Sequence, residues 1–214
     1  RAGSSQQMSA RLFIVSAPSG VGKTTIIQSA LSRWPSLRFS VSCTTRKPRP
    51  GEVNGRDYRF MSRQEFLEGV EKARFLEWAE VHGELYGTDG EAVQRWIQSG
   101  SDVLFDIDVQ GARQVLITHP TATTIFILPP SMESLEARLS KRGTESEAQL
   151  RRRLEAAAAE MAQAPWYDYL IVNDDLDEAI ADFESILRAT RRMRRHQSHQ
   201  LQALLKHPSP VNPS

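Results

Sequence analysis

The residues best suited to chemistry form one short segment, residues 16–25, which reads Ser-Ala-Pro-Ser-Gly-Val-Gly-Lys-Thr-Thr. It follows the apolar run Leu12–Val15 and leads into a helical pattern that begins at about Lys23. A glycine loop between a strand and a helix gathers backbone N–H groups at the helix N-terminus, where they can bind polyphosphate oxygens. Lys23 adds a positive charge for the β- and γ-phosphates, and the Thr24 hydroxyl is placed to bind Mg²⁺. We predict a polyphosphate site made by Ala17, Pro18, Ser19, Gly20, Val21, Gly22, Lys23, Thr24 and Thr25.

Ala17 departs from the strict phosphate-loop pattern, which has glycine at this position. The change removes none of the groups that bind phosphate, and Gly20 and Gly22 still let the backbone approach an anion without a Cβ atom in the way. The alternative is a glycine-rich turn of some other α/β protein. The Lys23-Thr24 pair and both flanking patterns favour the phosphate loop.

A basic segment stiffened by prolines, residues 44–50, is the second candidate site. Arg46 and Arg49 lie three residues apart, beside Pro48 and Pro50, and could hold one phosphate with little loss of conformational freedom. Considered alone, such a segment is more often a solvated charged loop. Beside a phosphate loop we favour an anion site, because a phosphotransferase needs a second site for its acceptor.

Two aspartates follow the apolar run of residues 102–105. Alternation along an extended chain directs Asp106 and Asp108 to the same side, at the carboxyl end of a strand, where ligands of α/β sheets bind. We predict that Asp106 completes the Mg²⁺ site opposite Thr24. Asp108 would face the acceptor, or it would cap the helix that starts near Val109.

Glu77 lies within an otherwise apolar alternating segment, Phe75–Val81. A carboxylate can accept two parallel hydrogen bonds from guanine, at N1–H and at the N2 amino group. Adenine offers an acceptor at N1 and has no N2 amino group, so the same carboxylate would discriminate strongly between the two bases. The sequence pattern alone nevertheless favours a surface glutamate.

Three arginines, Arg138, Arg142 and Arg153, flank a polar break at residues 140–146. They could close over a bound nucleotide and neutralise charge on its γ-phosphate, as a lid does. They could equally pair with glutamates on their own helix faces. The pattern does not decide between these two alternatives, and we assign no function to the basic run at residues 188–195.

Hydrophobic periodicity predicts an α/β fold with a doubly wound parallel sheet. Strands are expected at about residues 12–16, 38–42, 102–106, 124–128 and 169–172, with helices between them, and the strands at 102–106 and 169–172 are expected to be buried. Residues 44–99 look like an inserted α+β lobe. It contains a capped helix from Ser62, a strand at 75–81 paired with 85–87, and a helix over Thr88–Gly100.

A length of 214 residues fits one ordinary domain or one domain with lobes inserted in it, and the composition, 40% hydrophobic and 25% charged, is that of an ordinary globular protein. A net charge of +1 argues against a nucleic-acid binder that works by bulk electrostatics. The single cysteine, Cys43, excludes an intrachain disulfide and suits the cytoplasm. No apolar run approaches ~18 residues, so we expect no membrane span. We take Met8 as the native start, with residues 1–7 an expression remnant or a ragged extension.

Taken together, these motifs resemble those of the bacterial guanylate kinases, P-loop nucleoside monophosphate kinases, over about residues 12–192. The shared segments are residues 16–24, Val41–Glu52, Asp57-Tyr58, Tyr86-Gly87, Asp106–Gly111 and Ile171–Asp175. The resemblance implies direct in-line transfer of the γ-phosphoryl group of MgATP to GMP or dGMP, giving GDP or dGDP and ADP.

The resemblance also implies a division of the chain. Residues 9–43 and 100–195 would form the P-loop kinase core, residues 44–99 the GMP-binding insertion and residues 138–155 a short helical lid within the core segment. Residues 1–7 and 197–214 are expected to be disordered. The substrates are small molecules, no membrane or specific nucleic acid is expected, and the basic C-terminal helix could mediate a homo-oligomer.

Site roles follow from the resemblance residue by residue. The GMP site would comprise Ser42, Arg46, Arg49, Tyr58, Glu77, Tyr86, Gly87, Thr88 and Asp108. Arg138 and Asn173 would join the ATP site, and Thr24 with Asp106 would hold the metal. The catalytic residues would be Lys23, Arg46, Arg142 and Arg153. Thr88 has two readings, because the pattern makes it a helix cap and the resemblance makes it a base contact.

Two rival functions remain at this stage. One is a non-catalytic guanylate-kinase-like interaction module, whose phosphate loop looks eroded, whereas Lys23 and Thr24 are intact here. The other is a nucleoside monophosphate kinase for a different base, against which Ser42, Glu77 and Thr88 argue.

Overall fold

A five-stranded parallel sheet forms the centre of the computed structural model, which describes residues 10–81, 83–141 and 146–206. The strand order is β2-β7-β1-β8-β9, so the chain crosses over between neighbouring strands. All five residues of β1 are buried, as a strand covered on both faces requires. The strands are β1 (Leu12–Ser16), β2 (Leu37–Ser40), β7 (Asp102–Asp106), β8 (Thr123–Leu128) and β9 (Tyr169–Val172).

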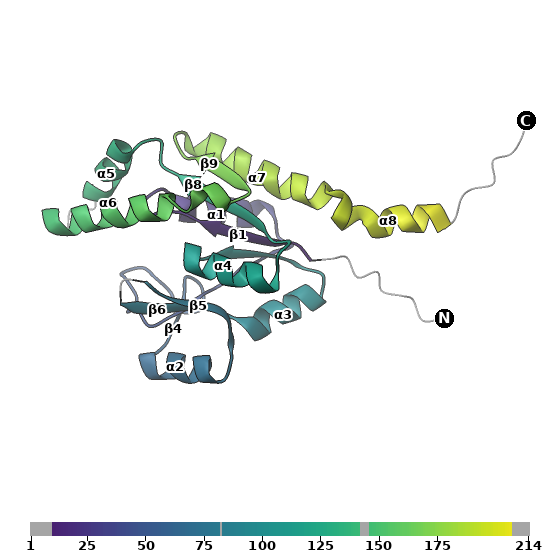
Figure 1. Ribbon diagram of the computed structural model, residues 1–214, viewed down its shortest axis with the longest axis horizontal. Coiled ribbons are helices and arrows are strands. Elements are labelled where there is room, and N and C mark those ends of the chain that lie inside the picture. The colour runs from purple at the N-terminus through teal and green to yellow at the C-terminus, as the bar shows by residue number, and fades with distance from the viewer. Residues whose placement is uncertain (1–9, 82, 142–145, 207–214) are drawn as a thin grey trace, which may run out of the picture.

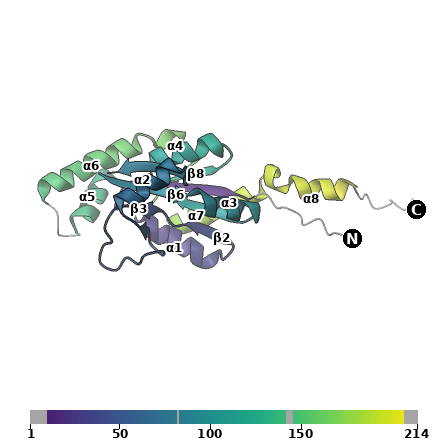
Figure 2. The same ribbon diagram turned by 90° about the horizontal axis from the view of Figure 1, so that it is seen from below.

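Alternate side chains of the central strands pack into two separate hydrophobic cores, one on each face of the sheet. Phe13 and Val15 pack toward α1 (Lys23–Arg33) and α7 (Leu176–Arg192). Leu12 and Ile14 pack on the opposite face. The helices α3 (Gly90–Gln98) and α4 (Val109–Thr118) and the short η1 (Ala164–Trp166) cover that face. Figure 2 shows α1 and α4 on opposite sides of the sheet. The doubly wound parallel fold is confirmed.

A second, four-stranded sheet lies between β2 and β7 in the sequence, with strand order β4-β3-β6-β5. It lies below the central sheet in Figure 1, with α2 beneath it. Cys43, Phe66 and Leu85 form its small core. Its elements are β3 (Cys43–Thr44), β4 (Arg59–Phe60), α2 (Arg63–Glu71), β5 (Phe75–Val81) and β6 (Glu84–Asp89).

Two further helices, α5 (Met132–Ser140) and α6 (Glu147–Met161), follow β8 and pack against each other beside the phosphate loop. The capping boxes predicted at Ser62 and at Ser146 are both present. In each box a serine hydroxyl accepts a backbone N–H three residues on, and the acidic or amide side chain there bonds back. Among the described helices, none is long and apolar enough to cross a bilayer.

Two expectations about elements are wrong. The helix predicted over Thr88–Gly100 begins at Gly90, because Asp89 is its N-cap and accepts the Ala92 N–H at 3.2 Å. Thr88 belongs to β6.

The expected disorder of residues 197–214 is also corrected in part. Helix α8 (Arg194–Lys206) includes residues 197–206 of this stretch and extends away from the rest of the protein (Figure 1). Residues 194–206 contain no proline and are rich in helix-forming Gln, Leu and Arg. Residues 1–9 and 207–214 lie outside the described part of the chain, so the expectation for residues 1–7 is not tested.

A buried carboxylate connects three segments at the start of β7. Asp102, which is 4% exposed, accepts the backbone N–H of Arg11 and its Nη1, both at 3.1 Å. Its second oxygen accepts Arg191 Nε at 2.8 Å, from the end of α7. A buried charge is tolerable only when it is paired in this way, so the three groups depend on one another.

We predict that Asp102→Ala lowers the free energy of unfolding by ~3–5 kcal/mol, because Arg11 would keep its buried position without its charge partner. Urea denaturation followed by circular dichroism measures the change. The control is Glu91→Ala, which removes an exposed pair with Arg95 on α3 and should change little. A loss for Asp102→Ala no larger than that of the control would contradict the prediction.

Candidate active site

The phosphate loop joins β1 to α1 and depends on two glycines. Gly20 and Gly22 have φ values of +94° and +93°, a region that side chains with a Cβ atom rarely adopt. A Cβ atom at Gly22 would also lie 2.7 Å from Asn173 Nδ2, and one at Gly20 would lie 2.6 Å from Leu139 Cδ2. Both positions therefore require glycine, and the loop curves around the N-terminus of α1.

Asn173 and Arg138, both predicted for the ATP site, donate hydrogen bonds to the backbone of this loop. Asn173 Nδ2 donates to the Val21 carbonyl at 2.6 Å, and Arg138 Nη1 donates to the same oxygen at 3.4 Å. Arg138 Nη2 also donates to the Asn173 carbonyl at 3.0 Å. The end of β9 and the end of α5 thus hold the loop backbone in place. Contact with a nucleotide base stays a prediction for both residues.

Lys23 and Asp106 form an ion pair between Nζ and Oδ1 at the carboxyl ends of β1 and β7. Burial works to lower the pKa of Lys23, but the carboxylate beside it outweighs burial and raises the pKa above its usual value. Lys23 is therefore a fixed positive charge at the mouth of the loop. Asp106 has the position predicted from the strand pattern.

The two residues predicted to bind a metal, Asp106 and Thr24, offer one carboxylate and one hydroxyl. Within the described residues, no group of three or more His, Cys, Asp or Glu side chains could hold a metal ion. A single carboxylate and a hydroxyl suit Mg²⁺, which is commonly bound through one or two protein oxygens together with nucleotide phosphates. These residues therefore fit a magnesium ion that arrives with its nucleotide.

One of the two outer lid arginines reaches the loop. Arg153 Nη2, on α6, donates to Ser19 Oγ at 2.8 Å. The other, Arg142, lies outside the described residues. Arg138 and Arg153 thus both contact the phosphate loop, and their closure over a bound nucleotide stays a prediction.

Arg46 is held by a residue that the sequence analysis left without a role. Its Nη1 and Nη2 donate to the two carboxylate oxygens of Glu52 at 3.0 and 2.8 Å, and Nη1 also donates to the Lys47 carbonyl at 2.8 Å. The guanidinium group lies over the ring of Tyr58, 5.2 Å from its centroid. The hydrogen bonds to Glu52 raise the pKa of Arg46. In the sequence, a role for Glu52 was indicated only by its place at the end of the shared motif Val41–Glu52.

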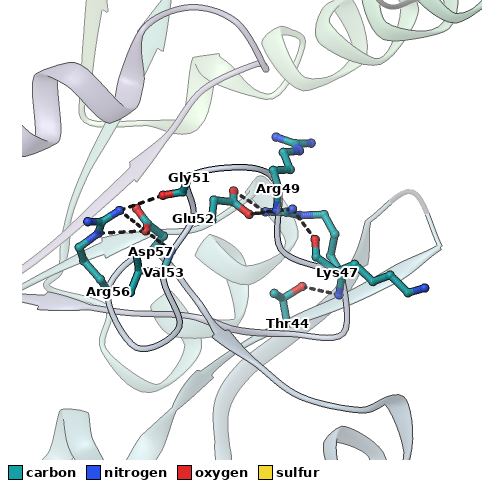
Figure 3. A network of polar contacts seen from close by, with 9 residues as sticks. Thr44, Lys47, Arg49, Gly51, Glu52, Val53, Arg56 and Asp57 are labelled. Atoms are coloured by element: carbon teal, nitrogen blue, oxygen red, sulfur yellow. Dashed lines mark hydrogen bonds and ion pairs between the residues drawn. The ribbon is translucent and has the colours of Figure 1, made fainter.

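Arg49 has a different environment from Arg46. Its backbone N–H donates to Glu52 at 2.7 Å, while its exposed side chain extends away from that network (Figure 3). Glu52 thereby fixes the turn that carries both arginines. The two predicted phosphate ligands belong to one ordered loop, and one of them is already paired.

Tyr58 connects the arginine loop with the phosphate loop. Burial raises the pKa of its hydroxyl, the negative charge of Asp106 raises it further, and Lys23 and Arg46 oppose the change. Its ring meets the ring of Tyr86 edge-on, with centroids 6.0 Å apart. Tyr58 therefore stacks under Arg46 and lies within electrostatic range of both Lys23 and Asp106. That the two groups bind two anions facing each other stays a prediction.

Glu77 is buried, with 4% of its surface exposed, so the surface position favoured by the pattern alone is wrong. It lies on β5 directly opposite Thr88 on β6, and Thr88 Oγ1 donates to Glu77 Oε1 at 2.6 Å. Burial raises the pKa of Glu77 to about 7, the Thr88 hydrogen bonds oppose the rise, and the charge of Asp108 adds to it. A buried carboxylate of this kind can bind a pair of donors from a ligand.

The remaining predicted residues lie around these groups. Ser42 is buried directly before β3. Gly87 pairs with Cys43, and a Cβ atom there would lie 2.9 Å from Phe66 Cζ, so packing of the lobe requires glycine. Asp108 caps α4 and accepts the Gly111 N–H at 2.8 Å. The capping alternative for Asp108 is thus present, and its charge also acts on Glu77.

Glu160, on α6, is a further acidic residue that the sequence analysis missed. Burial raises its pKa, the charge of Lys23 opposes this, and Asp108 adds to it, so Glu160 lies near both. A cavity of about 380 Å³ between the first turn of α4 and the end of α6 is lined by Val109, Gln110, Arg113, Ala159, Glu160 and Gln163. The available signal was that Glu160 is the one charged residue in the stretch 156–165.

The chain is similar to known guanylate kinases in sequence and in fold. The family model described as guanylate kinase matches residues 9–190. A guanylate kinase of Dechloromonas aromatica is 49% identical over 86% of this chain and 91% of that protein. One of Rubrobacter xylanophilus is 49% identical over 83% of this chain and 93% of that protein. The crystal structure of a guanylate kinase from Anaplasma phagocytophilum superposes with a TM-score of 0.75, at 33% identity, over 95% of this chain and 97% of that one.

We predict a pH-dependent stability difference between the protein and its Glu77→Gln variant. A raised carboxyl pKa favours the folded state below pH 4.5, and that contribution is lost as pH rises through about 7. From pH 4.5 to 8 the unmodified protein should lose ~3 kcal/mol relative to the variant, since each pKa unit corresponds to ~1.4 kcal/mol. Urea denaturation at both pH values measures it. An equal difference between the two proteins at both pH values would contradict the prediction.

Proposed function

Because this chain belongs to the guanylate kinase family, it transfers the terminal phosphoryl group of ATP to GMP, and we propose that two facing groups of its side chains carry out this reaction. The observation that carries the proposal is the position of Tyr58. It stacks under Arg46 and responds to the charges of Lys23 and Asp106. The acceptor phosphate would bind on the Arg46 side and the donor phosphates on the Lys23 side.

The acceptor phosphate is proposed to bind Arg46, Arg49, Tyr58 and Tyr86. Arg49 is exposed and available, whereas Arg46 shares its guanidinium group with Glu52. Arginine donates in a planar fork that suits both carboxylate and phosphate, so GMP would compete with Glu52 or share Arg46 with it. Glu52 keeps the guanidinium oriented until the substrate binds.

The guanine base is proposed to bind Ser42, Glu77 and Thr88, with Asp108 supporting the same side. The burial of Glu77 supports this role, because a buried carboxylate with one partner gains from two further donors. Guanine provides those donors at N1–H and N2. Adenine would leave the carboxylate unsatisfied, which explains selectivity for GMP and dGMP over AMP.

Transfer needs neither a covalent intermediate nor a strong general base, because the attacking oxygen already belongs to an anion. Lys23 and the backbone N–H groups of residues 19–25 would hold the donor phosphates. Arg46 and Arg153, together with Arg142, would neutralise charge that develops on the transferred group. Thr24 and Asp106 would hold Mg²⁺, which supplies further positive charge next to the β- and γ-phosphates.

The functions proposed for the segments of the chain correspond to the two sheets. Residues 9–43 and 100–195 are proposed as the kinase core, 44–99 as the GMP-binding lobe and 138–155 as the lid. Closure of the lobe and lid would exclude water that could otherwise hydrolyse ATP. We further propose that the enzyme acts in the cytoplasm on small-molecule substrates, and that its oligomeric state involves the basic C-terminal helix.

We expect Lys23→Ala to abolish phosphoryl transfer while GMP affinity changes little, because Lys23 belongs to the donor side. A coupled assay of ADP formation measures turnover, and calorimetric titration measures the binding of GMP and of a non-hydrolysable ATP analogue separately. If GMP affinity collapsed while affinity for the ATP analogue held, the proposed division of the two sites would be wrong.

Base selectivity gives a second prediction. In a coupled assay that offers GMP, dGMP, AMP, UMP and CMP, only the two guanine nucleotides should support rapid turnover. Glu77→Gln should lower kcat/KM for GMP by ~100-fold or more, because an amide cannot accept both guanine hydrogen bonds. Equal rates on AMP and GMP would rule out the proposed recognition of guanine by Glu77.

A further inference from the structure

Helix α4 of the core contacts the edge of the second sheet right beside Glu77. β5 is an edge strand of that sheet, so the backbone groups on its outer side lack a strand partner. The side-chain amide of Gln114 forms two hydrogen bonds with the backbone of one residue on this edge, Trp78. Trp78 N–H donates to Gln114 Oε1 at 3.1 Å, and Gln114 Nε2 donates to the Trp78 carbonyl at 2.7 Å. The amide of Gln114 thus holds the backbone of the residue next to Glu77.

Gly111 lies one turn earlier on the same face of α4. A Cβ atom at this position would lie 3.0 Å from Glu77 Cδ and still closer to Oε2, where it would overlap the carboxylate. Its backbone is helical, without the positive φ that Gly20 and Gly22 show. The backbone conformation of residue 111 therefore does not require glycine. Glycine is required because the Glu77 carboxylate occupies the space that a Cβ atom would need.

A β-bulge directs Glu77 toward this helix. The register of β5 with β6 shifts between Phe75 and Glu77, so that Phe75 pairs with Asp89 and Glu77 with Thr88. The extra residue, Leu76, packs against the core of the central sheet. Bulges of this kind turn a side chain away from the direction that simple alternation would give. The bulge, Gly111 and Gln114 all act on the same short stretch, residues 76–78.

We propose that Gly111 and Gln114 are positioning residues that set the Glu77 carboxylate and thereby the selectivity for guanine. The inference rests on the proposed role of Glu77 in base recognition. Gly111 provides the space in which Oε2 lies, and Gln114 fixes the backbone from which Glu77 extends. Neither residue touches the reacting phosphates, so both should affect how GMP binds more than how fast it reacts.

Gly111→Ala is the direct test. The added methyl group would displace Glu77, so KM for GMP should rise by ~10-fold or more, while kcat and KM for ATP stay within ~3-fold. The preference for GMP over IMP, which lacks the N2 amino group, should fall by a similar factor. A purely structural role for Gly111 would lower the amount of active enzyme, and hence kcat, and would leave the GMP:IMP ratio unchanged. That outcome would overturn the proposal.

Gln114→Met gives a second test should the alanine variant fold poorly. Methionine keeps the length of the side chain but cannot bond to Trp78, so the GMP:IMP preference should fall by ~3-fold or more, with kcat little changed. The matched control on the same helix is Ile117→Ala, since Ile117 is 80% exposed, and its constants should equal those of the unmodified enzyme. An unchanged preference in Gln114→Met would remove Gln114 from the proposal.

Glu77→Gln separates failure of this inference from failure of the proposed function. If that variant keeps the GMP:IMP preference, Glu77 does not read the base and the proposed site is wrong. If it loses the preference while Gly111→Ala and Gln114→Met keep it, the base site stands and only the positioning role fails.

Discussion

The ion pair between Lys23 and Asp106 is the interaction on which the rest of this site depends. It forms where two adjacent parallel strands end, so the sheet register that pairs Val15 with Asp106 brings a lysine and a carboxylate together. The same edge carries the phosphate loop, and Tyr58 extends the electrostatic connection to the arginine loop of the second sheet. The fixed positive charge of Lys23 thus lies at the strand ends, beside the phosphate loop.

Helix α4 is the second organising element because it serves both sheets at once. Its N-cap, Asp108, ends the segment that begins with Asp106, and its first turn packs against Glu77. Gln114 then bonds to the edge of β5. Any movement of the second sheet relative to the central sheet must therefore pivot on this helix or break these two hydrogen bonds.

The errors of the sequence reading have specific physical causes. Thr88 and Asp89 are both good N-cap residues, and only the pairing of Thr88 with Glu77 and of Asp89 with Phe75 shows that the strand extends two residues beyond the predicted 85–87. Glu77 was judged exposed because most glutamates are. Its burial depends on Thr88, on a bulge and on a glycine distant in sequence. The partner role of Glu52 was hidden because a turn brings it back onto Arg46.

The sequence by itself determined what local patterns encode. These were the positions of the five strands of the central sheet, most helix starts and their caps, and the phosphate loop, whose chemistry is written in consecutive residues. The burial expected for residues 169–172 is wrong, because β9 is an edge strand that leaves Leu170 and Val172 about half exposed. Only the tertiary structure decided which charges meet: Lys23 with Asp106, Arg46 with Glu52, and Glu77 with Thr88 beside Gly111. The reason is physical, because periodicity reports burial along one element, whereas an ion pair or a shifted pKa arises from distances between elements that are remote in the chain.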